Sequence, residues 1–453
     1  MKNKKFLVVG FIFVLSISTF FADAKEHPTI NILDNKQTIN MIGGDMERSA
    51  AFLLKSTNPK EIANWVYKDI DLKVCRVSYD KKQELVEGEK TLEFYDNAIK
   101  AMQYVKNARP SVKFWGTLKS DYDGYGAENN LPDWIYKEYV DKDYNPDNLD
   151  TNKYACFLAD YLKYHQDHKV PISYLSVTKE WGQVVTAEKE KETIEKLKDL
   201  LLNNNNYKKI KVPLFIGPAS WGVGGGQKFL ETVKEKNWSN LYYGFSTHDY
   251  DKPKIDSWKS FVDTSHSMNR FAWNDESNLG AGGRFNGNEP PISSTIDAYL
   301  KKTTFYRAGL DGEVLFENWS RGLSVETRSI YFIENQPGKR LRGYYISKLF
   351  GNHIYNWTYF DSSLNQLNDV DTMVFRHKNR LILWVLNKSE NKYNNIEVIS
   401  NKINFDPNIK VHQRYWTETT KIEGKTKSFY PHKNHFKISV PQKSISAFLL
   451  KLQ

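Results

Sequence analysis

Short apolar segments alternate with amphipathic, helix-like segments between residues 39 and 350. Apolar runs of this length predict buried strands, and strands that alternate with helices predict βαβ units and a parallel sheet. The predicted strands are Ile39–Gly43, Leu72–Tyr79, Val112–Leu118, Ile172–Glu180, Val212–Pro218, Leu241–His248, Arg270–Asp275 and Val314–Trp319. The helix-like segments include Lys60–Lys68, Thr91–Lys106, Lys153–Tyr164, Ala187–Leu202, Gly226–Lys236, Ser294–Ala308 and Lys339–Phe350. Eight such strands favour a closed (β/α)8 TIM barrel, with an open doubly wound sheet as the alternative.

The pattern changes after Tyr355, where short strands follow one another and no long helix intervenes. The predicted strands there are Met373–His377, Arg380–Leu386, Asn395–Val398, His412–Trp416, His435–Ser439 and Ile445–Leu450. Asn, Lys, Pro and Gly separate them, which is typical of an antiparallel β-sandwich. We therefore expect a β-sandwich domain at residues 351–453, with the segment 27–35 as a candidate extra strand. No linker rich in Pro, Gly or Ser separates it from the barrel, so we expect a tight interface.

The first 24 residues have the pattern of a secretory signal peptide. A cationic start, Met1–Lys5, precedes the apolar run Phe6–Phe21 and the A-x-A sequence Ala22–Ala24. A membrane anchor is the alternative, but the run is shorter than the ~20 apolar residues that a span needs. We therefore expect a mature chain that begins at Lys25, a barrel at residues 25–350, and a secreted or periplasmic protein without a membrane span.

Composition narrows the range of partners. The formal net charge is +10, and the mature chain would carry +8 because the leader contributes three lysines and one aspartate. This charge favours an acidic polymer or surface, but no basic run indicates nucleic acid. Aromatic residues make up 14% of the chain, and Tyr and Trp rings stack on sugars as well as filling cores.

The two cysteines, Cys75 and Cys156, lie in apolar contexts, so we expect buried free thiols rather than a disulfide. We also expect a monomer.

Two predicted strands end in a glutamate beside a tryptophan. The fourth strand runs into Lys179-Glu180-Trp181, and the seventh runs through Trp273 to Glu276, 96 residues later. In a (β/α)8 barrel the carboxyl ends of the strands converge on one mouth, where the fold carries its chemistry. Two facing carboxylates are what glycoside hydrolysis requires, and they lie about 5–5.5 Å apart in retaining enzymes. The alternatives for each glutamate are a helix cap or a structural ion pair, and Glu317 on the eighth strand is a rival nucleophile.

Other side chains at these strand ends are candidates for binding substrate. Arg76, at the end of the second strand, could hold Glu276 ionised or form a structural salt bridge. His248 could donate to the substrate or to Glu276, or be a core histidine. The candidate stacking platforms are Trp115, Trp181 and Trp319, with packing in the barrel wall as the alternative. His165 and His168 lack a third ligand nearby, so we predict no metal site and no cofactor.

Several of these segments together resemble a clan A retaining glycoside hydrolase, and most of all glycoside hydrolase family 30. The segments that carry the resemblance are Met41–Glu47, Val74–Val77, Ile172–Trp181, Gly244–Tyr250, Trp273–Glu276 and the end of the chain at Ser444–Phe448. The resemblance implies a two-glutamate double displacement with Glu180 as acid and Glu276 as nucleophile. It also implies that His248 and Tyr250 lie near the nucleophile and that Arg76 belongs to the active site.

One residue departs from the family pattern. The family has asparagine before the acid and often proline after it, whereas this chain has Lys179 and Trp181. A lysine is a point cation with three donors and no acceptor. Lys179 could contact a sugar oxygen or a carboxylate or sulfate on the substrate, or it could only tune Glu180. The same departure would also fit a site that binds sugar without cleaving it.

The sequence therefore predicts a secreted retaining β-glycosidase that hydrolyses a polysaccharide or its oligosaccharides. The net charge and Lys179 favour an acidic or sulfated glycan, although family 30 enzymes also act on β-glucosides, xylans, β-1,6-linked glucans and galactans, and β-fucosides. The main alternative is a catalytically decayed carbohydrate-binding protein on the same scaffold. A polysaccharide lyase is a third alternative, but lyases usually need a Tyr, His or Lys base rather than a carboxylate pair.

Overall fold

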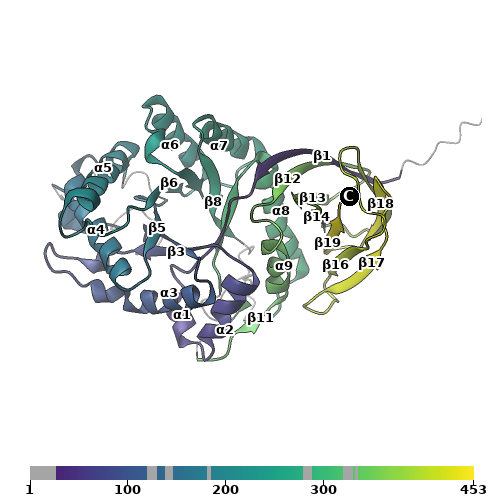
Figure 1. Ribbon diagram of the computed structural model, residues 1–453, viewed down its shortest axis with the longest axis horizontal. Helices are drawn as coiled ribbons and strands as arrows, with labels where there is room; N and C mark the ends of the chain where they lie inside the picture. The colour runs from purple at the N-terminus through teal and green to yellow at the C-terminus, as the bar shows by residue number, and fades with distance from the viewer. Residues whose placement is uncertain are drawn as a thin grey trace, which may run out of the picture.

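The computed structural model describes residues 27–119, 130–137, 146–180, 185–278, 288–319, 330–331 and 335–453. The predicted signal peptide and Trp181 lie outside the described residues. Most of the chain forms a barrel wrapped by helices, and a separate β-rich body is packed against one side of it (Figure 1).

Eight parallel strands close into a barrel, which confirms the predicted (β/α)8 architecture. The barrel strands are β2 (Met41–Asp45), β3 (Val74–Tyr79), β4 (Lys113–Leu118), β5 (Ile172–Leu175), β6 (Leu214–Ser220), β7 (Gly244–Thr247), β8 (Phe271–Asn278) and β9 (Gly312–Phe316). The α-helices are α1 (Ala50–Lys55), α2 (Pro59–Ala63), α3 (Asp96–Ala108), α4 (Thr151–Asp167), α5 (Ala187–Asn203), α6 (Val223–Glu235), α7 (Ile255–Ser267), α8 (Ile292–Ala308) and α9 (Arg342–Gly351). Shorter elements are the helical turns η1 (Asn64–Asp69), η2 (Lys81–Gln83), η3 (Leu92–Tyr95), η4 (Asp133–Ile135), η5 (Pro146–Asn148) and η6 (Ser239–Leu241), and the strands β10 (Ile330–Tyr331) and β11 (Lys339–Arg340).

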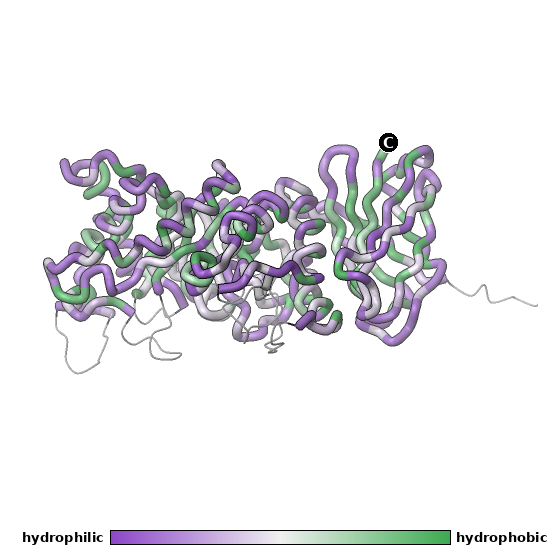
Figure 2. The backbone as a smooth tube through the Cα atoms, turned by 90° about the horizontal axis from the view of Figure 1, so that it is seen from below, coloured by the Kyte–Doolittle hydropathy of each residue, from purple (hydrophilic) through white to green (hydrophobic). Residues whose placement is uncertain are grey.

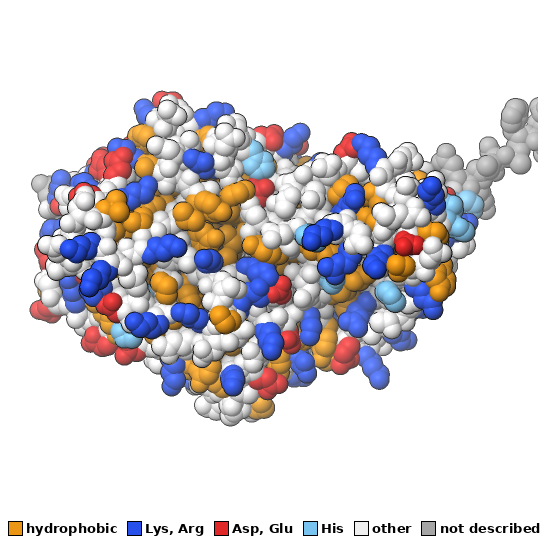
Figure 3. Space-filling view, viewed as in Figure 1, with side chains coloured by type: hydrophobic (Ala, Val, Ile, Leu, Met, Phe, Trp, Pro, Cys, Tyr) orange, Lys and Arg blue, Asp and Glu red, His pale blue; other side chains and the backbone are white. Residues whose placement is uncertain are grey.

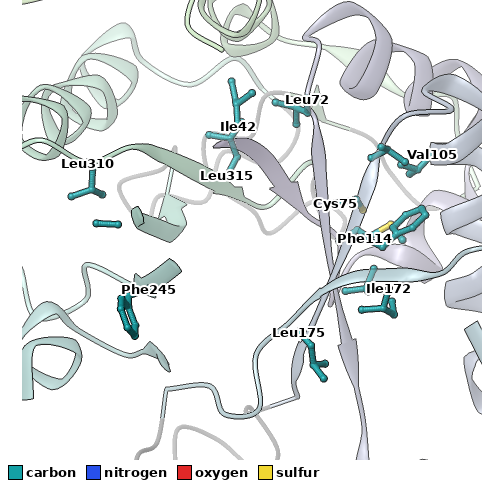
Figure 4. Close-up of a cluster of buried hydrophobic side chains, with 14 of the residues drawn as sticks. Ile42, Leu72, Cys75, Val105, Phe114, Ile172, Leu175, Phe245, Leu310 and Leu315 are labelled. Atoms are coloured by element: carbon teal, nitrogen blue, oxygen red, sulfur yellow. The ribbon is translucent and has the colours of Figure 1, made fainter. Parts of the chain in front are cut away.

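Alternate strand residues face the barrel interior and the helices. Six interior side chains, one from each of six strands, form a buried plug: Met41, Val74, Trp115, Ile216, Trp273 and Val314. Outward-facing residues such as Ile42, Phe114, Leu175 and Leu315 pack beneath the helices (Figure 4). Apolar segments accordingly run through the interior while the helices that cover them are largely hydrophilic (Figure 2). The plug fills the barrel, so a ligand can approach only at the two ends of the barrel.

The C-terminal body is one nine-stranded sheet that curls into a sandwich. Its strand order is β17-β16-β19-β14-β13-β12-β1-β15-β18. The bounds are β1 (Thr29–Thr38), β12 (Thr358–Asn365), β13 (Val370–His377), β14 (Arg380–Asn387), β15 (Tyr393–Ser400), β16 (Val411–Trp416), β17 (Lys425–Phe429), β18 (His435–Val440) and β19 (Ser444–Lys451). The rings of Phe429 and Phe436, from the two edge strands, are only 6.0 Å apart, so the sheet almost closes on itself. All its pairings are antiparallel except β1 with β15.

One face of this sheet packs directly on the barrel. Trp384 of β14 stacks on Tyr299 of α8, with ring centroids 6.1 Å apart, and also contacts Phe350 of α9 at 5.5 Å. The Thr303 hydroxyl of α8 donates to the Asp371 carboxylate of β13 at 2.8 Å. The barrel and this face of the sheet therefore share one hydrophobic core, while the inside of the curled sheet holds a second one.

Both cysteines are free, as predicted, but only Cys75 is buried. Cys75 points from β3 into the layer between strand and helices (Figure 4). The prediction of burial is wrong for Cys156, which lies on the outer side of α4 and is exposed. In the parts of the chain that the structure describes, no helix is both long and apolar enough to cross a bilayer.

Candidate active site

Glu180 follows β5 in an unusual backbone conformation. Its φ is +60°, in the left-handed region that residues with a Cβ rarely adopt. Its amide donates to the Ala219 carbonyl at 2.8 Å, and an isolated bridge joins it to Ser220 at the end of β6. The neighbouring strand therefore fixes the direction of a side chain that has left the β5 ladder.

Glu276 lies on β8 with its carboxylate almost fully buried. Oε1 contacts the Arg76 guanidinium and the Lys179 ammonium, the latter at 3.1 Å. Oε2 accepts a hydrogen bond of 2.6 Å from the Tyr250 hydroxyl. The Glu276 amide donates to the Asn274 side chain at 3.1 Å. Both carboxylate oxygens are thus held by donors, and the group has little freedom to rotate.

Glu180, Glu276 and His248 converge at the barrel mouth. One carboxylate oxygen of each glutamate and one ring nitrogen of His248 all lie within 4.8 Å of one another. His248 Nδ1 is 3.5 Å from Glu180 Oε1 and 3.5 Å from Glu276 Oε2, and its Nε2 is 3.6 Å from Asp275 Oδ2. The two carboxylates are thus close enough to act on one glycosidic bond.

The surrounding cations keep Glu276 ionised. Burial raises its pKa, but Arg76, His248 and Lys179 outweigh burial and hold the pKa well below the ordinary value. Arg76 is itself anchored, because its Nε donates to Asp45 at 2.6 Å and its Nη1 donates to Asp275 at 3.2 Å. Such a carboxylate is held in its ionised form and in one orientation, as a nucleophile needs to be.

The same environment acts on the acid candidate. Burial raises the pKa of Glu180, but the charge of Lys179 and the neighbouring His248 bring it below its ordinary value. Burial lowers the pKa of His248, but Glu276 and Asp275 together raise it to about 10. His248 is therefore a cation at neutral pH, and it lies 3.5–3.6 Å from the carboxylates of Glu180, Glu276 and Asp275.

A protonated His248 is a poor metal ligand, since its nitrogens carry protons. Glu180, His248 and Glu276 are nevertheless the group of described residues whose donor atoms lie close enough together to hold an ion. The donor atoms converge, but the charge state of His248 fits an ion-pair network better than a metal site.

Lys179 is placed in a way that the sequence did not indicate. Its side chain has no exposed surface and lies between Glu276 and Glu47, with Nζ 2.7 Å from Glu47 Oε2. The ammonium therefore neither reaches into open solvent for a substrate anion nor turns away from the site. Glu47, which comes just after β2, is a buried member of the site that sequence reasoning missed.

The predicted tryptophan platforms are not available to a sugar. Trp115 belongs to the buried plug, and its Nε1 donates to Ser176 at 3.0 Å. Trp319 is also fully buried, and its Nε1 donates to the Ser49 carbonyl at 2.9 Å. Both positions face the interior of the protein, which corrects the prediction for these two residues. Glu317, the rival nucleophile, is buried at the end of β9 and is not part of the group formed by Glu180, His248 and Glu276.

Trp221 is a more suitable aromatic surface. It is 40% exposed, immediately follows β6, and its amide contacts the Glu180 carbonyl at 3.4 Å. Its ring lies 6.0 Å from the ring of Tyr250, which binds Glu276. The sequence signal was a tryptophan between the end of a strand and the glycines at 222 and 224–226.

No protein-family model matches the sequence, and no curated protein matches it either. Solved structures do match, over almost the whole chain. A family 30 subfamily 8 xylanase, Xyn30A from Clostridium acetobutylicum, has a TM-score of 0.68 at 15% identity, covering 94% of this chain and 99% of that one. The catalytic domain of xylanase C from Talaromyces cellulolyticus, also of family 30, gives 0.69 at 10% identity, with 93% and 100% covered. An endo-β1,6-glucanase gives 0.64 at 11% identity, with 94% of both chains covered. The chain therefore has the fold of family 30 glycoside hydrolases, as the sequence resemblance predicted.

Proposed function

We propose that the protein is a retaining β-glycosidase that hydrolyses a polysaccharide or its oligosaccharides. The observation that carries this proposal is the approach of Glu180 and Glu276, whose nearest oxygens are no more than 4.8 Å apart at the mouth of the barrel. An inverting enzyme would need about 6.5–9.5 Å between its carboxyl groups to admit a water molecule. The structural neighbours, two of them named xylanases and one an endo-glucanase, support the same class of reaction.

In this mechanism Glu276 attacks the anomeric carbon and Glu180 gives its proton to the departing sugar oxygen. The glycosidic C–O bond breaks as an ester bond forms to Glu276. Glu180, now ionised, removes a proton from water, and the hydroxide oxygen displaces Glu276 from the anomeric carbon. Arg76 and Tyr250 hold the carboxylate of Glu276 in the free enzyme, so it is ready to attack without reorganisation.

The lowered pKa of Glu180 sets a condition on this mechanism. A general acid must be protonated, and Lys179 and His248 favour its ionised form. We therefore expect the enzyme to work best at acidic pH, where Glu180 still carries its proton.

We also propose that the chain is exported, because its first 24 residues have the pattern of a signal peptide. N-terminal sequencing of the mature protein tests this.

The site indicates the type of reaction more closely than it indicates the class of substrate. Lys179 is engaged by Glu47 and Glu276, so it gives no support to an acidic glycan, and only the net charge of the chain still does. Trp221 offers a sugar-stacking surface beside the acid. A panel of purified xylans, β-glucans and galactans, each with a neutral and an acidic or sulfated form where one exists, would identify the glycan.

The stereochemistry of the first product tests the mechanism. With Glu180 and Glu276 this close, the first sugar released should keep the β configuration at its anomeric carbon. Proton NMR of the anomeric region during the first minutes of hydrolysis measures this directly. An initial α-anomer would exclude a covalent intermediate on Glu276.

A carbohydrate-binding protein that has lost catalysis is the second candidate, and the lowered pKa of Glu180 is the observation that favours it. Turnover separates the two functions. Hydrolysis of an aryl β-glycoside that disappears in Glu276→Ala supports the enzyme. Glycan binding without any turnover, from acidic to neutral pH, supports the binding protein.

A further inference from the structure

Glu47 is a carboxylate at the barrel mouth that is more enclosed than either member of the catalytic pair. It lies two residues after the end of β2, its side chain has no exposed surface, and its amide donates to Asp45 Oδ1 at 3.0 Å. Oε2 is 2.7 Å from Lys179 and 4.0 Å from Arg76, and Oε1 is 3.4 Å from Lys119. Burial raises its pKa, but Lys179, Lys119 and Arg76 lower the pKa to about 2, so Glu47 is an anion throughout the working range.

The lysine that Glu47 binds is shared with the nucleophile. Lys179 Nζ is 2.7 Å from Glu47 and 3.1 Å from Glu276 Oε1. Without Glu47, the ion pair left to this buried ammonium among the described residues would be the one with the nucleophile. The ammonium would then stabilise the ground state of Glu276 and lower the pKa of Glu180 further, and both effects slow a double displacement.

We propose that Glu47 is a positioning residue, which holds Lys179 on one oxygen of the nucleophile and balances its charge so that Glu180 can act as an acid. This role rests on the proposed glycosidase function and adds a residue to it. Glu47 acts through Lys179, and nothing in the proposal requires it to touch the substrate. Lys179 and Glu47 then act as one unit, and either residue without the other lowers the rate of hydrolysis.

The proposal predicts opposite shifts in the pH profile for the two single variants. Loss of the lysine charge in Lys179→Asn should raise the pKa of Glu180 and move the alkaline limb of kcat/KM to higher pH. Loss of the balancing anion in Glu47→Gln should move that limb to lower pH. Each shift should be on the order of one unit, as for other charges removed from within a few ångströms of a carboxylate.

The double variant Glu47→Gln/Lys179→Asn is the decisive measurement. It replaces the ion pair with two amides, and its kcat on the glycan identified in the panel should exceed that of Glu47→Gln by at least tenfold.

Two further variants serve as controls. Glu47→Asp keeps the charge but has a shorter side chain, so it should keep the wild-type pH limb and have a lower kcat. Glu313→Gln is the matched control, because it breaks another buried lysine–glutamate pair, the one with Lys302 of α8. It should lower the melting temperature and leave the pH limb in place.

Thermal melts of the same variants separate a structural effect from a positioning effect. A purely structural ion pair would lower the melting temperature of both single variants without moving the pH limbs. The proposal is overturned if the limbs stay at their wild-type positions, or if the double variant is no faster than the slower single variant. If the wild-type protein shows no turnover, the proposed function is overturned together with this role. If the wild type is active and the effects of the two single substitutions simply add in the double variant, this role alone is overturned.

Discussion

At the scale of single residues, the site is built by placing one glutamate outside regular strand geometry. A non-glycine residue in the left-handed region costs on the order of 1 kcal/mol or more. In Glu180 this strain is offset by a hydrogen bond to Ala219 and a bridge to Ser220. The conformation directs the carboxylate of Glu180 toward His248 instead of along β5. A residue that is strained in this way is expected to serve function rather than stability.

The separate roles of the two glutamates can be tested with azide. In Glu180→Ala a 2,4-dinitrophenyl glycoside needs little protonation, so in the proposed mechanism Glu276 should still form the covalent intermediate. Azide should then replace water at the anomeric carbon, restore much of the lost rate and give a β-glycosyl azide, because a small anion needs no general base.

In Glu276→Ala no nucleophile remains, and turnover should fall by several orders of magnitude. Product analysis by NMR and initial rates with and without azide measure both effects. If Glu317→Ala is inactive while Glu276→Ala retains activity, the nucleophile lies on β9 instead of β8.

The sequence was sufficient to select Glu180 and Glu276 as a candidate pair, which the structure brings together, because a carboxylate at the end of an apolar strand stands out in the local pattern. It could not show that Lys179 meets Glu47, since the two lie 132 positions apart and come together only when the barrel closes. It also could not separate Trp115 and Trp319 from true platforms. A strand alternates between two faces, and a shift of one residue decides which face a ring occupies.

At the scale of elements, the barrel wall carries buried polar groups that have no place in the mechanism. Glu190 of α5 is fully buried behind β6, and a Cβ on Gly217 would come within 2.7 Å of its Oε1. Burial raises the pKa of Glu190 to about 8, with only Tyr242 acting in the opposite direction. Glu190 is therefore neutral in the folded protein at pH values where it is ionised in the unfolded chain.

This arrangement makes stability depend on pH. The raised pKa means that the contribution of Glu190 is complete below pH 4.5 and is lost as pH rises to about 8. Glu190→Gln has the same shape and no charge to lose, so it should be more stable than the wild type at pH 8 by on the order of a few kcal/mol. The difference should nearly vanish at pH 4. Melting temperatures across this range measure it, with Glu188→Gln on the exposed side of the same helix as the control. A difference that does not change with pH would show that burial of the charge is not its cause.

The barrel strands were easier to predict than two of the helices. All eight barrel strands lie where apolar runs occur, with ends shifted by a few residues. The helix-like segments named from the sequence include neither α1 nor α7. α7 is rich in serine and aspartate and therefore has low helix propensity. Its helical state comes from packing, since Trp258, Phe261, Val262 and Ser265 all face the barrel. The parallel pairing of β1 with β15 was also out of reach, because no local pattern specifies which strands meet across more than 350 residues.

At the scale of the whole molecule, the barrel and the curled sheet depend on one another. β1 starts the chain in the sheet, pairing with β12 and β15, before β2 enters the barrel. The face of β13 and β14 that covers α8 and α9 belongs to the same buried cluster as the barrel wall. A barrel without the sheet would expose large aromatic side chains, and a sheet without the barrel would do the same. The two bodies, which form one continuous surface in space-filling view (Figure 3), are thus coupled energetically.

We therefore expect calorimetry to show one unfolding transition for the whole chain, not one for each body. Trp384→Ala tests the coupling, since Trp384 is fully buried between β14 and the helices α8 and α9. Loss of such a ring costs about 3–5 kcal/mol, and the cost should appear in the barrel as well as in the sheet. Loss of glycosidase activity on heating, which reports the barrel, should shift down together with the calorimetric peak. Tyr430→Ala, which removes a 58% exposed ring from the sheet, should move neither. Two resolved transitions, with only the one from the sheet displaced by Trp384→Ala, would mean that the shared core does not couple the two bodies.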